Sequence, residues 1–210
     1  MDLFEYMSMQ RKKEESPLAV RMRPKNLDEV VGQQHIIGKD KLLYRAIKAD
    51  KISSLIFYGP PGTGKTTLAK VIANTTSADF VQMNATTSGK KDMEQAVSQA
   101  KDAFGMYGKK TILFIDEIHR FNKAQQDYLL PFVEDGTVIL IGATTENPYF
   151  EVNSALLSRS QIFHLEPLSQ KDICKLVKTA VEDNERGMGA YGAEITEEAE
   201  QFIAQMEGGD

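Results

Sequence analysis

An eight-residue loop rich in glycine and proline constrains this 210-residue chain more than any other feature. The loop fits the pattern G-x-x-x-x-G-K-[ST] at every specified position, through Gly59, Pro60, Pro61, Gly62, Thr63, Gly64, Lys65 and Thr66. The apolar run 52–58 predicts a buried strand before the loop, and residues 67–73 predict a helix after it. In that setting the glycines turn backbone N–H groups toward phosphate oxygens, and the helix N-terminus adds partial positive charge. The loop therefore predicts an α/β fold that binds a nucleotide.

The chemistry of the last loop residues predicts their roles. Lys65 is expected to reach the β- and γ-phosphates of ATP, and the Thr66 hydroxyl to hold Mg²⁺. Thr67, the next residue, completes the expected phosphate-binding set. The alternative is a turn that binds nothing, and the well-formed flanking strand and helix argue against it.

The rest of the chain alternates apolar runs with helical patterns, which predicts a parallel sheet flanked by helices on both faces. The predicted strands are 79–84, 111–117, 137–145 and 161–165, and the predicted helices are 38–48, 88–104 with Ser88 as N-cap, and 122–133. Beyond residue 168 only helices are predicted, at 169–185 and 196–206. We expect a mobile tail at 1–16, a nucleotide-binding domain at 17–166 and part of a helical domain at 167–210.

Composition limits the kinds of site, compartment and partner that we expect for this chain. A single cysteine, Cys174, excludes a disulfide framework or a cysteine-rich zinc site within one chain. No apolar run is long enough to span a bilayer and no apolar signal segment follows Met1, so no membrane partner is expected. The single cysteine fits a reducing, cytoplasmic setting. The net charge is −5, but nine acidic residues and one basic residue fall in 182–210, leaving +3 elsewhere. Overall charge therefore neither supports nor excludes a DNA-binding face.

Polar residues at the ends of two other predicted strands are candidates for catalysis. Asp116 ends an apolar strand, where a carboxylate could hold Mg²⁺ through water, and Glu117 follows at a position suited to orient an attacking water. Thr144 and Thr145 could hydrogen-bond the γ-phosphate, although β-branched residues also serve strand propensity. For His119, contact with the nucleotide site and a surface or helix-start role both stay open. His35, His164 and an isolated Arg159 receive no role from spacing alone.

Together these motifs resemble the AAA+ ATPases, and within them the RarA/MgsA (Werner-helicase-interacting protein) family of replication-fork ATPases. The resemblance depends on the loop at Gly59, on Asp-Glu-Ile-His-Arg at 116–120, and on three further segments: Pro-Leu-Ala-Val-Arg-Met-Arg-Pro at 17–24, Gly-Ala-Thr-Thr-Glu-Asn-Pro at 142–148 and Asn-Ser-Ala-Leu-Leu-Ser-Arg at 153–159. It covers nearly everything from Pro17 to Asp210. The implied fold is a P-loop AAA+ domain followed by the start of a small helical lid.

The resemblance also implies roles for single residues. Glu117 would be the catalytic glutamate, Thr145 the sensor of the γ-phosphate with Thr144 as second choice, and Arg159 an arginine finger that acts on the ATP of a neighbouring subunit. Asn84 would restrain the glutamate until DNA is bound. The adenine pocket would be lined by Met22, Arg23, Pro24, Val30 and Val31.

The function implied by the resemblance is that of a DNA-dependent ATPase at stalled replication forks, which remodels DNA ends or forks in recombination and repair. The expected partners are single-stranded, gapped or forked DNA, further copies of the chain, single-stranded-DNA-binding protein and the replication machinery, in a nucleoid-associated location. The family's sensor 2 arginine and oligomerisation region would lie beyond Asp210, so we interpret the chain as an N-terminal fragment.

Three other functions stay open. A RuvB-like branch-migration motor shares the Gly-Ala-Thr-Thr strand, but here Glu-Asn-Pro follows it at 146–148. A bacterial clamp-loader subunit usually carries a cysteine-rich zinc module between the two motifs, and no cysteine lies between Lys65 and Asp116. A non-hydrolysing nucleotide-binding scaffold would lack a catalytic group. For DNA contacts the candidates are Lys90, Lys91, Arg120 and Lys123, with a solvated helix face as the alternative.

Overall fold

The computed structural model describes residues 16–206, and the predicted tail at 1–16 lies almost wholly outside them. The described residues form two compact units. One is Lys25–Pro167, which contains the sheet, and the other joins 16–24 to 168–206. Residues 17–24, which the sequence analysis assigned to the nucleotide-binding domain, thus group with the helical unit, and the expected domain boundaries stay a prediction.

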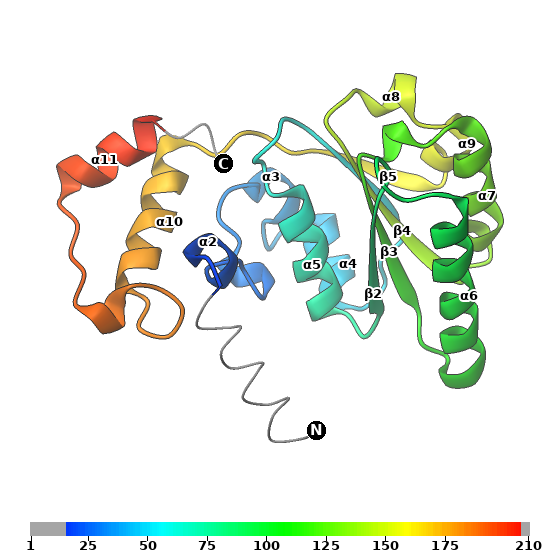
Figure 1. Cartoon of the computed structure of the whole chain (residues 1–210), viewed down its shortest axis with the longest axis horizontal. Coiled ribbons are helices and arrows are strands. Elements are labelled where there is room, and N and C mark those ends of the chain that lie inside the picture. The colour runs from blue at the N-terminus through cyan, green and yellow to red at the C-terminus, as the bar shows by residue number, and fades with distance from the viewer. Residues whose placement is uncertain (1–15, 207–210) are drawn as a thin grey trace. The chain divides into compact units, whose positions relative to one another are not determined.

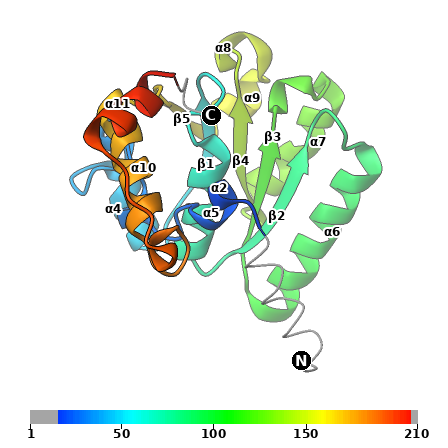
Figure 2. The same cartoon turned by 60° about the vertical axis from the view of Figure 1, so that its left-hand side comes forward.

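A five-stranded parallel sheet with the order β2-β3-β4-β1-β5 organises the larger unit, with β2 and β5 at its two edges (Figure 2). The strands are β1 (Ser54–Tyr58), β2 (Asp79–Asn84), β3 (Thr111–Asp116), β4 (Val138–Thr144) and β5 (Ser160–His164). All five predicted strands are therefore confirmed, to within two residues at each end. Because β3, β4 and β1 are neighbours, their carboxyl ends bring together the three polar segments that the sequence singled out.

Helices cover both faces of this sheet (Figure 1). The helices of the sheet unit are η1 (Leu27–Glu29), α3 (Gln34–Ile37), α4 (Leu42–Lys48), α5 (Lys65–Thr75), α6 (Lys90–Tyr107), η2 (Ile118–Arg120), α7 (Lys123–Glu134), α8 (Pro148–Glu151) and α9 (Ser154–Leu157). Alternation along the strands divides the core in two. Phe57 packs with α4 and α5 on one face, whereas Ile56, its neighbour, packs with α6 and α7 on the other.

Local chemistry sets the helix ends. The prediction of Ser88 as N-cap is wrong: the N-cap of α6 is Gly89, whose N–H donates to the Asp92 carboxylate at 2.7 Å. The carboxylate three residues into the helix holds the chain at Gly89, one residue later than expected. Gly108 ends α6 in the left-handed conformation, at φ 63°.

The helical unit contains α2 (Leu18–Arg21), α10 (Gln170–Glu182), η3 (Gly189–Tyr191) and α11 (Glu197–Met206). The N-cap of α10 is Ser169, in a reciprocal pair with Asp172. Both helices predicted after residue 168 are confirmed, although α10 ends three residues earlier than expected. Among the described residues, no helix is both long and apolar enough to cross a membrane.

Candidate active site

The loop after β1 has the backbone geometry that a phosphate site requires. Gly59 adopts φ 150°, and a Cβ there would lie 2.2 Å from the carbonyl oxygen of Leu165. Gly64, at φ 86°, is the N-cap of α5, and no side chain caps that helix. The first N–H groups of α5 are therefore left for an anion, at the positive end of the helix dipole.

Lys65 is a buried cation whose ammonium group donates to backbone carbonyls of its own loop. Its side chain is 8% exposed, and Nζ donates to the carbonyls of Gly59 at 2.8 Å and Pro60 at 2.7 Å. Burial lowers the pKa of Lys65, while the charges of Glu117 and Asp116 raise it. Phosphate oxygens are stronger partners for an ammonium group than carbonyls are, so this lysine suits a nucleotide.

Asp116 and Glu117 lie where β3 leaves the sheet. Burial first, and the neighbouring Glu117 second, raise the pKa of Asp116, and Lys65 opposes them. Glu117 adopts the left-handed conformation at φ 53°, which turns the chain directly into η2. The structure thus brings together the lysine and the two carboxylates that the sequence predicted.

The donors fit Mg²⁺ bound together with a nucleotide. Asp116 is a partly buried carboxylate beside a second carboxylate, and Thr66 supplies a hydroxyl at the second position of α5. Mg²⁺ typically takes one or two protein oxygens and completes its shell with phosphates and water. No group of three or more His, Cys, Asp or Glu suited to a metal occurs among residues 16–206, so a separate metal centre gains no support there.

His119 belongs to this site, which the sequence left open. Its side chain is 7% exposed, and Nδ1 lies 2.8 Å from Thr144 Oγ1 and 3.3 Å from Glu117 Oε2. Thr145 Oγ1 donates to the same Oε2 at 3.4 Å. Glu117 therefore lies between one threonine and one histidine. Sequence spacing could not assign His119 to the site, because the direction of its side chain depends on the backbone turn at Glu117.

Asn84 ends β2 beside Asp116 in the sheet register. Its Oδ1 accepts from the N–H of Thr86 at 2.9 Å and from the Thr86 hydroxyl at 2.5 Å. None of the hydrogen bonds found within 16–206 joins Asn84 to Glu117. Restraint of the glutamate by Asn84 stays a prediction.

Arg159 lies at the amino ends of the strands, whereas the phosphate loop lies at their carboxyl ends. It precedes β5, whose first residue pairs with Ser54 at the start of β1, whereas the loop follows Tyr58 at the end of β1. At about 3.3 Å per residue, the strand alone separates them by roughly 13 Å. Arg159 donates to Ala155 O at 2.8 Å and forms an ion pair with Glu134. Within one subunit, it is therefore placed away from that subunit's own loop.

Gln33 is a functional candidate that the sequence analysis missed. This buried residue donates through Nε2 to Glu166 O at 2.7 Å and to Thr63 O at 3.3 Å, and its Oε1 accepts from Glu166 N at 3.1 Å. It thereby connects the phosphate loop to the chain after β5. Its partners are 30 and 133 residues away, so no local pattern could have shown the role.

The expected adenine pocket stays a prediction. Met22, Arg23 and Pro24 belong to the helical unit, and Val30 and Val31 to the sheet unit.

A groove of about 530 Å³ near the starts of α6 and α7 includes one of the DNA-contact candidates. Lys90 lines it together with Asn122, Gln125 and Tyr128. The other three candidates, Lys91, Arg120 and Lys123, are exposed. Their contact with DNA is untested.

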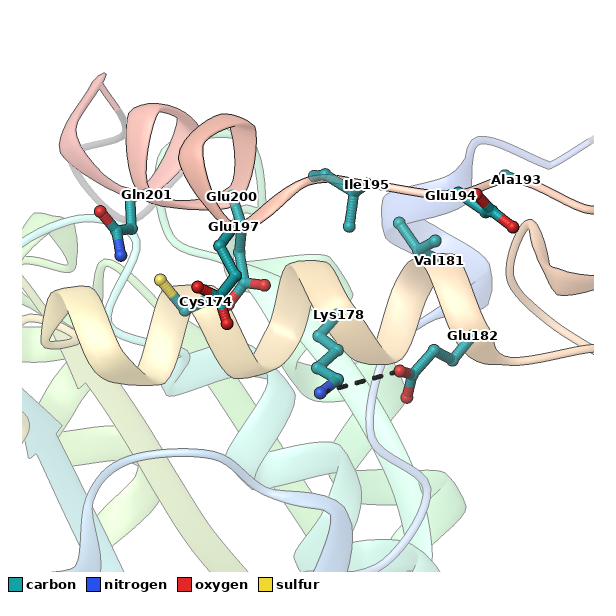
Figure 3. A pocket seen from close by; sticks show the side chains of 10 residues that line it. All are labelled: Cys174, Lys178, Val181, Glu182, Ala193, Glu194, Ile195, Glu197, Glu200 and Gln201. Atoms are coloured by element: carbon teal, nitrogen blue, oxygen red, sulfur yellow. Dashed lines mark ion pairs between the residues drawn. The ribbon is translucent and has the colours of Figure 1, made fainter.

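The helical unit has a groove of its own, of about 590 Å³, between α10 and the segment that leads into α11 (Figure 3). Four glutamates line it: Glu182, Glu194, Glu197 and Glu200. Lys178 also lines it and lies 3.9 Å from Glu182. An acidic lining repels phosphate, so this groove suits a nucleotide less well than the loop after β1 does.

The fold and the site define a class of protein. The model of the ATPase family associated with various cellular activities (AAA) matches residues 55–168, and the chain belongs to that family. It is 50% identical over 194 residues to Replication-associated recombination protein A of Escherichia coli (strain K12), covering 92% of this chain and 43% of that protein. It is also 44% identical over 179 residues to ATPase WRNIP1 of Dictyostelium discoideum, covering 85% of this chain and 20% of that protein.

Solved structures agree with this assignment. The Thermotoga maritima RuvB Holliday junction branch migration motor matches with a TM-score of 0.70 and 30% identity, over 88% of this chain and 59% of that chain. The AAA fold and the resemblance to replication-associated recombination protein A are therefore confirmed. The chain spans less than half the length of these two sequence relatives.

Proposed function

We propose that this chain is the ATP-hydrolysing part of a DNA-dependent ATPase that acts at stalled replication forks in recombination and repair. One observation carries the proposal: a buried lysine on an uncapped helix start lies within electrostatic reach of a carboxylate that two side chains hold in place. A site that only bound nucleotide would not need Glu117 to be oriented.

In the proposed reaction, Lys65 and the N-terminus of α5 bind and orient the phosphates. Glu117 orients a water molecule and accepts its proton as the water oxygen attacks the γ-phosphorus. The bond from that phosphorus to the bridging oxygen breaks, giving ADP and phosphate. When bound, Mg²⁺ would neutralise charge developing on the phosphates, held by Thr66 and Asp116.

Lys65→Ala and Glu117→Gln test the hydrolytic function. We expect Lys65→Ala to lose nucleotide binding, because the substitution removes the buried ammonium group that would hold the β- and γ-phosphates. We expect Glu117→Gln to bind ATP as before and to lose turnover, because an amide cannot take the proton. Binding is measured with a fluorescent ATP analogue, and turnover as phosphate release. Normal hydrolysis by Glu117→Gln would reject the assigned base.

DNA dependence is proposed from the names of the relatives and from the basic side chains Lys90, Lys91, Arg120 and Lys123. Replacing all four by alanine should weaken DNA binding and reduce the salt slope by about 3, at roughly 0.7 per single-strand contact. A matched control removes four lysines elsewhere: Lys39, Lys48, Lys51 and Lys70. Unchanged affinity and slope in the first variant would exclude this surface.

Phosphate release with different DNA structures separates the proposed function from a branch-migration motor or a clamp loader. The assay uses this chain and a protein extended to its relatives' length, with single-stranded, duplex, gapped, forked and four-way-junction DNA. We expect forks, gaps or single strands to stimulate best. Preference for four-way junctions would favour the RuvB-like motor, and strict dependence on a sliding clamp would favour a clamp loader. Single-stranded-DNA-binding protein, the replication machinery and a nucleoid-associated, cytoplasmic location belong to the same proposal.

A further inference from the structure

We propose that His119 is a positioning residue for hydrolysis, which holds the Glu117 carboxylate and ties it to the buried hydroxyl of Thr144. The proposal rests on the function proposed above, since it concerns the same glutamate. It adds a residue that neither the phosphate-loop motif nor the chemistry of phosphoryl transfer requires.

Packing of the preceding residue carries His119 into the site. Ile118 is fully buried, and a Cβ built on Gly142 of β4 would lie 3.0 Å from Ile118 Cδ1 and 2.7 Å from Ile56 Cδ1. The absence of a side chain at Gly142 thus makes the room that Ile118 uses. Thr144 lies two residues further on, on the same face of β4. The turn that buries Ile118 therefore delivers the next side chain, His119, to Thr144.

The hydrogen-bond partners assign a proton to Nδ1 of His119. That nitrogen faces Thr144 Oγ1 at 2.8 Å and Glu117 Oε2 at 3.3 Å. A carboxylate only accepts, and Thr144 Oγ1 also accepts from the N–H of Glu146 at 3.0 Å. A bare Nδ1 would direct its lone pair at the carboxylate. An N–H at Nδ1 satisfies both neighbours, as the orienting partner of a histidine usually decides its tautomer.

The same contacts give Thr144 and Thr145 different roles. Thr144 is fully buried, and its hydroxyl contacts His119 and the Glu146 N–H. Thr145 is partly exposed and donates directly to Glu117. Oε2 of Glu117 is thus approached by one donor from η2 and another from beyond β4. Removing His119 takes away the contact that is anchored in the core, so the carboxylate gains freedom.

Three variants of His119 separate positioning from packing. Asparagine places an amide near the position of Nδ1, glutamine places it near Nε2, and alanine removes the group. We expect His119→Asn to retain most of kcat and His119→Gln and His119→Ala to lose it by about tenfold to a hundredfold, the scale of a misplaced catalytic group. The dissociation constant for ATP should stay unchanged in all three, because the phosphate loop is untouched.

Thr144→Val gives a second, independent measurement, and His35 gives the control. Valine keeps the shape of Thr144 and removes its hydroxyl, so kcat should fall while ATP affinity holds. His35→Asn and His35→Gln change a histidine whose Nε2 contacts His164 O instead of Glu117, and should leave kcat as it was. In ¹⁵N spectra of the unmodified chain, His119 should show the Nδ1–H tautomer.

The outcomes distinguish this inference from the proposed function. If Glu117→Gln loses turnover while His119→Ala keeps normal kcat, the positioning role is refuted and the function stands. Equal kcat for the asparagine and glutamine variants would refute it too. Normal turnover in Glu117→Gln would instead refute the assigned glutamate. If His119→Ala does not fold, the ratio of the asparagine to the glutamine variant and the Thr144→Val result still decide.

Discussion

Arg159 and Glu134 form an ion pair at the amino ends of the strands, through Nη2 of the guanidinium and Oε1 of the carboxylate. Glu134 ends α7, which precedes β4, and Arg159 precedes β5, so the ion pair joins the segments that lead into the two strands on either side of β1. The arginine is therefore held by side-chain and backbone groups at the amino ends of the strands, away from the phosphate loop at their carboxyl ends.

Arg159→Ala should hardly change turnover of this 210-residue chain measured alone. In a protein extended to its relatives' length, with subunits stacked head to tail, the same substitution should lower turnover about a thousandfold, the worth of an arginine finger supplied in trans. Steady-state phosphate release from both proteins checks this, with exposed Arg45→Ala as control. Equal, fast turnover by both unmodified proteins would refute action in trans.

Glu134→Gln addresses the ion pair itself. Both side chains are more than a third exposed, so the pair should contribute no more than about 1 kcal/mol to the free energy of unfolding. The melting temperature should therefore show almost no change. Turnover of the extended protein should not fall either, because the substitution frees the guanidinium of Arg159 and does not remove it. A large fall in melting temperature would show that the pair is structural.

Asp116→Asn should stabilise the nucleotide-free chain at neutral pH. Burial and Glu117 raise the pKa of Asp116 above 3.8, so the folded state binds its proton more tightly than the unfolded state does. Above the raised pKa, the ionised carboxylate therefore lowers the free energy of unfolding. This destabilisation decreases as the pH falls through the raised pKa toward 3.8, because the carboxyl group takes up its proton. Asparagine avoids this destabilisation while keeping an oxygen for the Glu117 N–H, 3.2 Å from Oδ1.

Melting temperatures of Asp116→Asn and the unmodified chain, measured over a pH series without nucleotide, check this expectation. The advantage of the variant should be largest at neutral pH and shrink in acid. Asp102→Asn, on the exposed face of α6, is the control. An advantage that grows in acid would contradict the argument. The variant should also lose Mg²⁺-dependent hydrolysis.

Gly59→Ala should lower the melting temperature and weaken ATP binding. Its Cβ would lie 2.2 Å from a backbone oxygen of Leu165, which cannot move aside as a side-chain tip could, and φ is 150°. Gly105→Ala is the matched control: nothing lies within 4 Å of the new Cβ inside α6, so about 0.5–1 kcal/mol of stabilisation is expected. Similar behaviour of the two variants in calorimetry and ATP titration would contradict this.

Gln33→Leu should destabilise the sheet unit and reduce ATP affinity. The substitution leaves Glu166 O and N and Thr63 O without the partners that the glutamine supplied, at about 1–3 kcal/mol for each group left unsatisfied. Its neighbour Gln34 is exposed, so Gln34→Leu is the control. Denaturant unfolding and ATP titration measure both effects. If the two variants unfold alike, the connection through Gln33 is not stabilising.

Sequence rules predicted those parts of the site that depend on local residues. The strand–loop–helix at 52–73, the strand ending in Asp116 and the strand ending in Thr144 were all found where expected. Buried strands and glycine-rich turns are specified by adjacent residues, and carboxyl ends of parallel strands meet at one edge in any order of the strands. Ser88 is not the N-cap because the Asp92 carboxylate, in the first turn of the helix, accepts from the N–H of Gly89.

By itself, then, the sequence determined the class of fold, the phosphate loop, the Asp116-Glu117 pair and the threonines. Only the tertiary structure decided which side chains surround the glutamate. His119 reaches it because Ile118 packs over Gly142. Gln33 joins Thr63 of the loop, 30 residues away in the sequence, to Glu166, 133 residues away. The strand order β2-β3-β4-β1-β5 is likewise a long-range choice, and it makes β5, which follows Arg159, the neighbour of the strand that precedes the phosphate loop. Such placements follow from packing and pairing between distant segments, which local propensity does not encode.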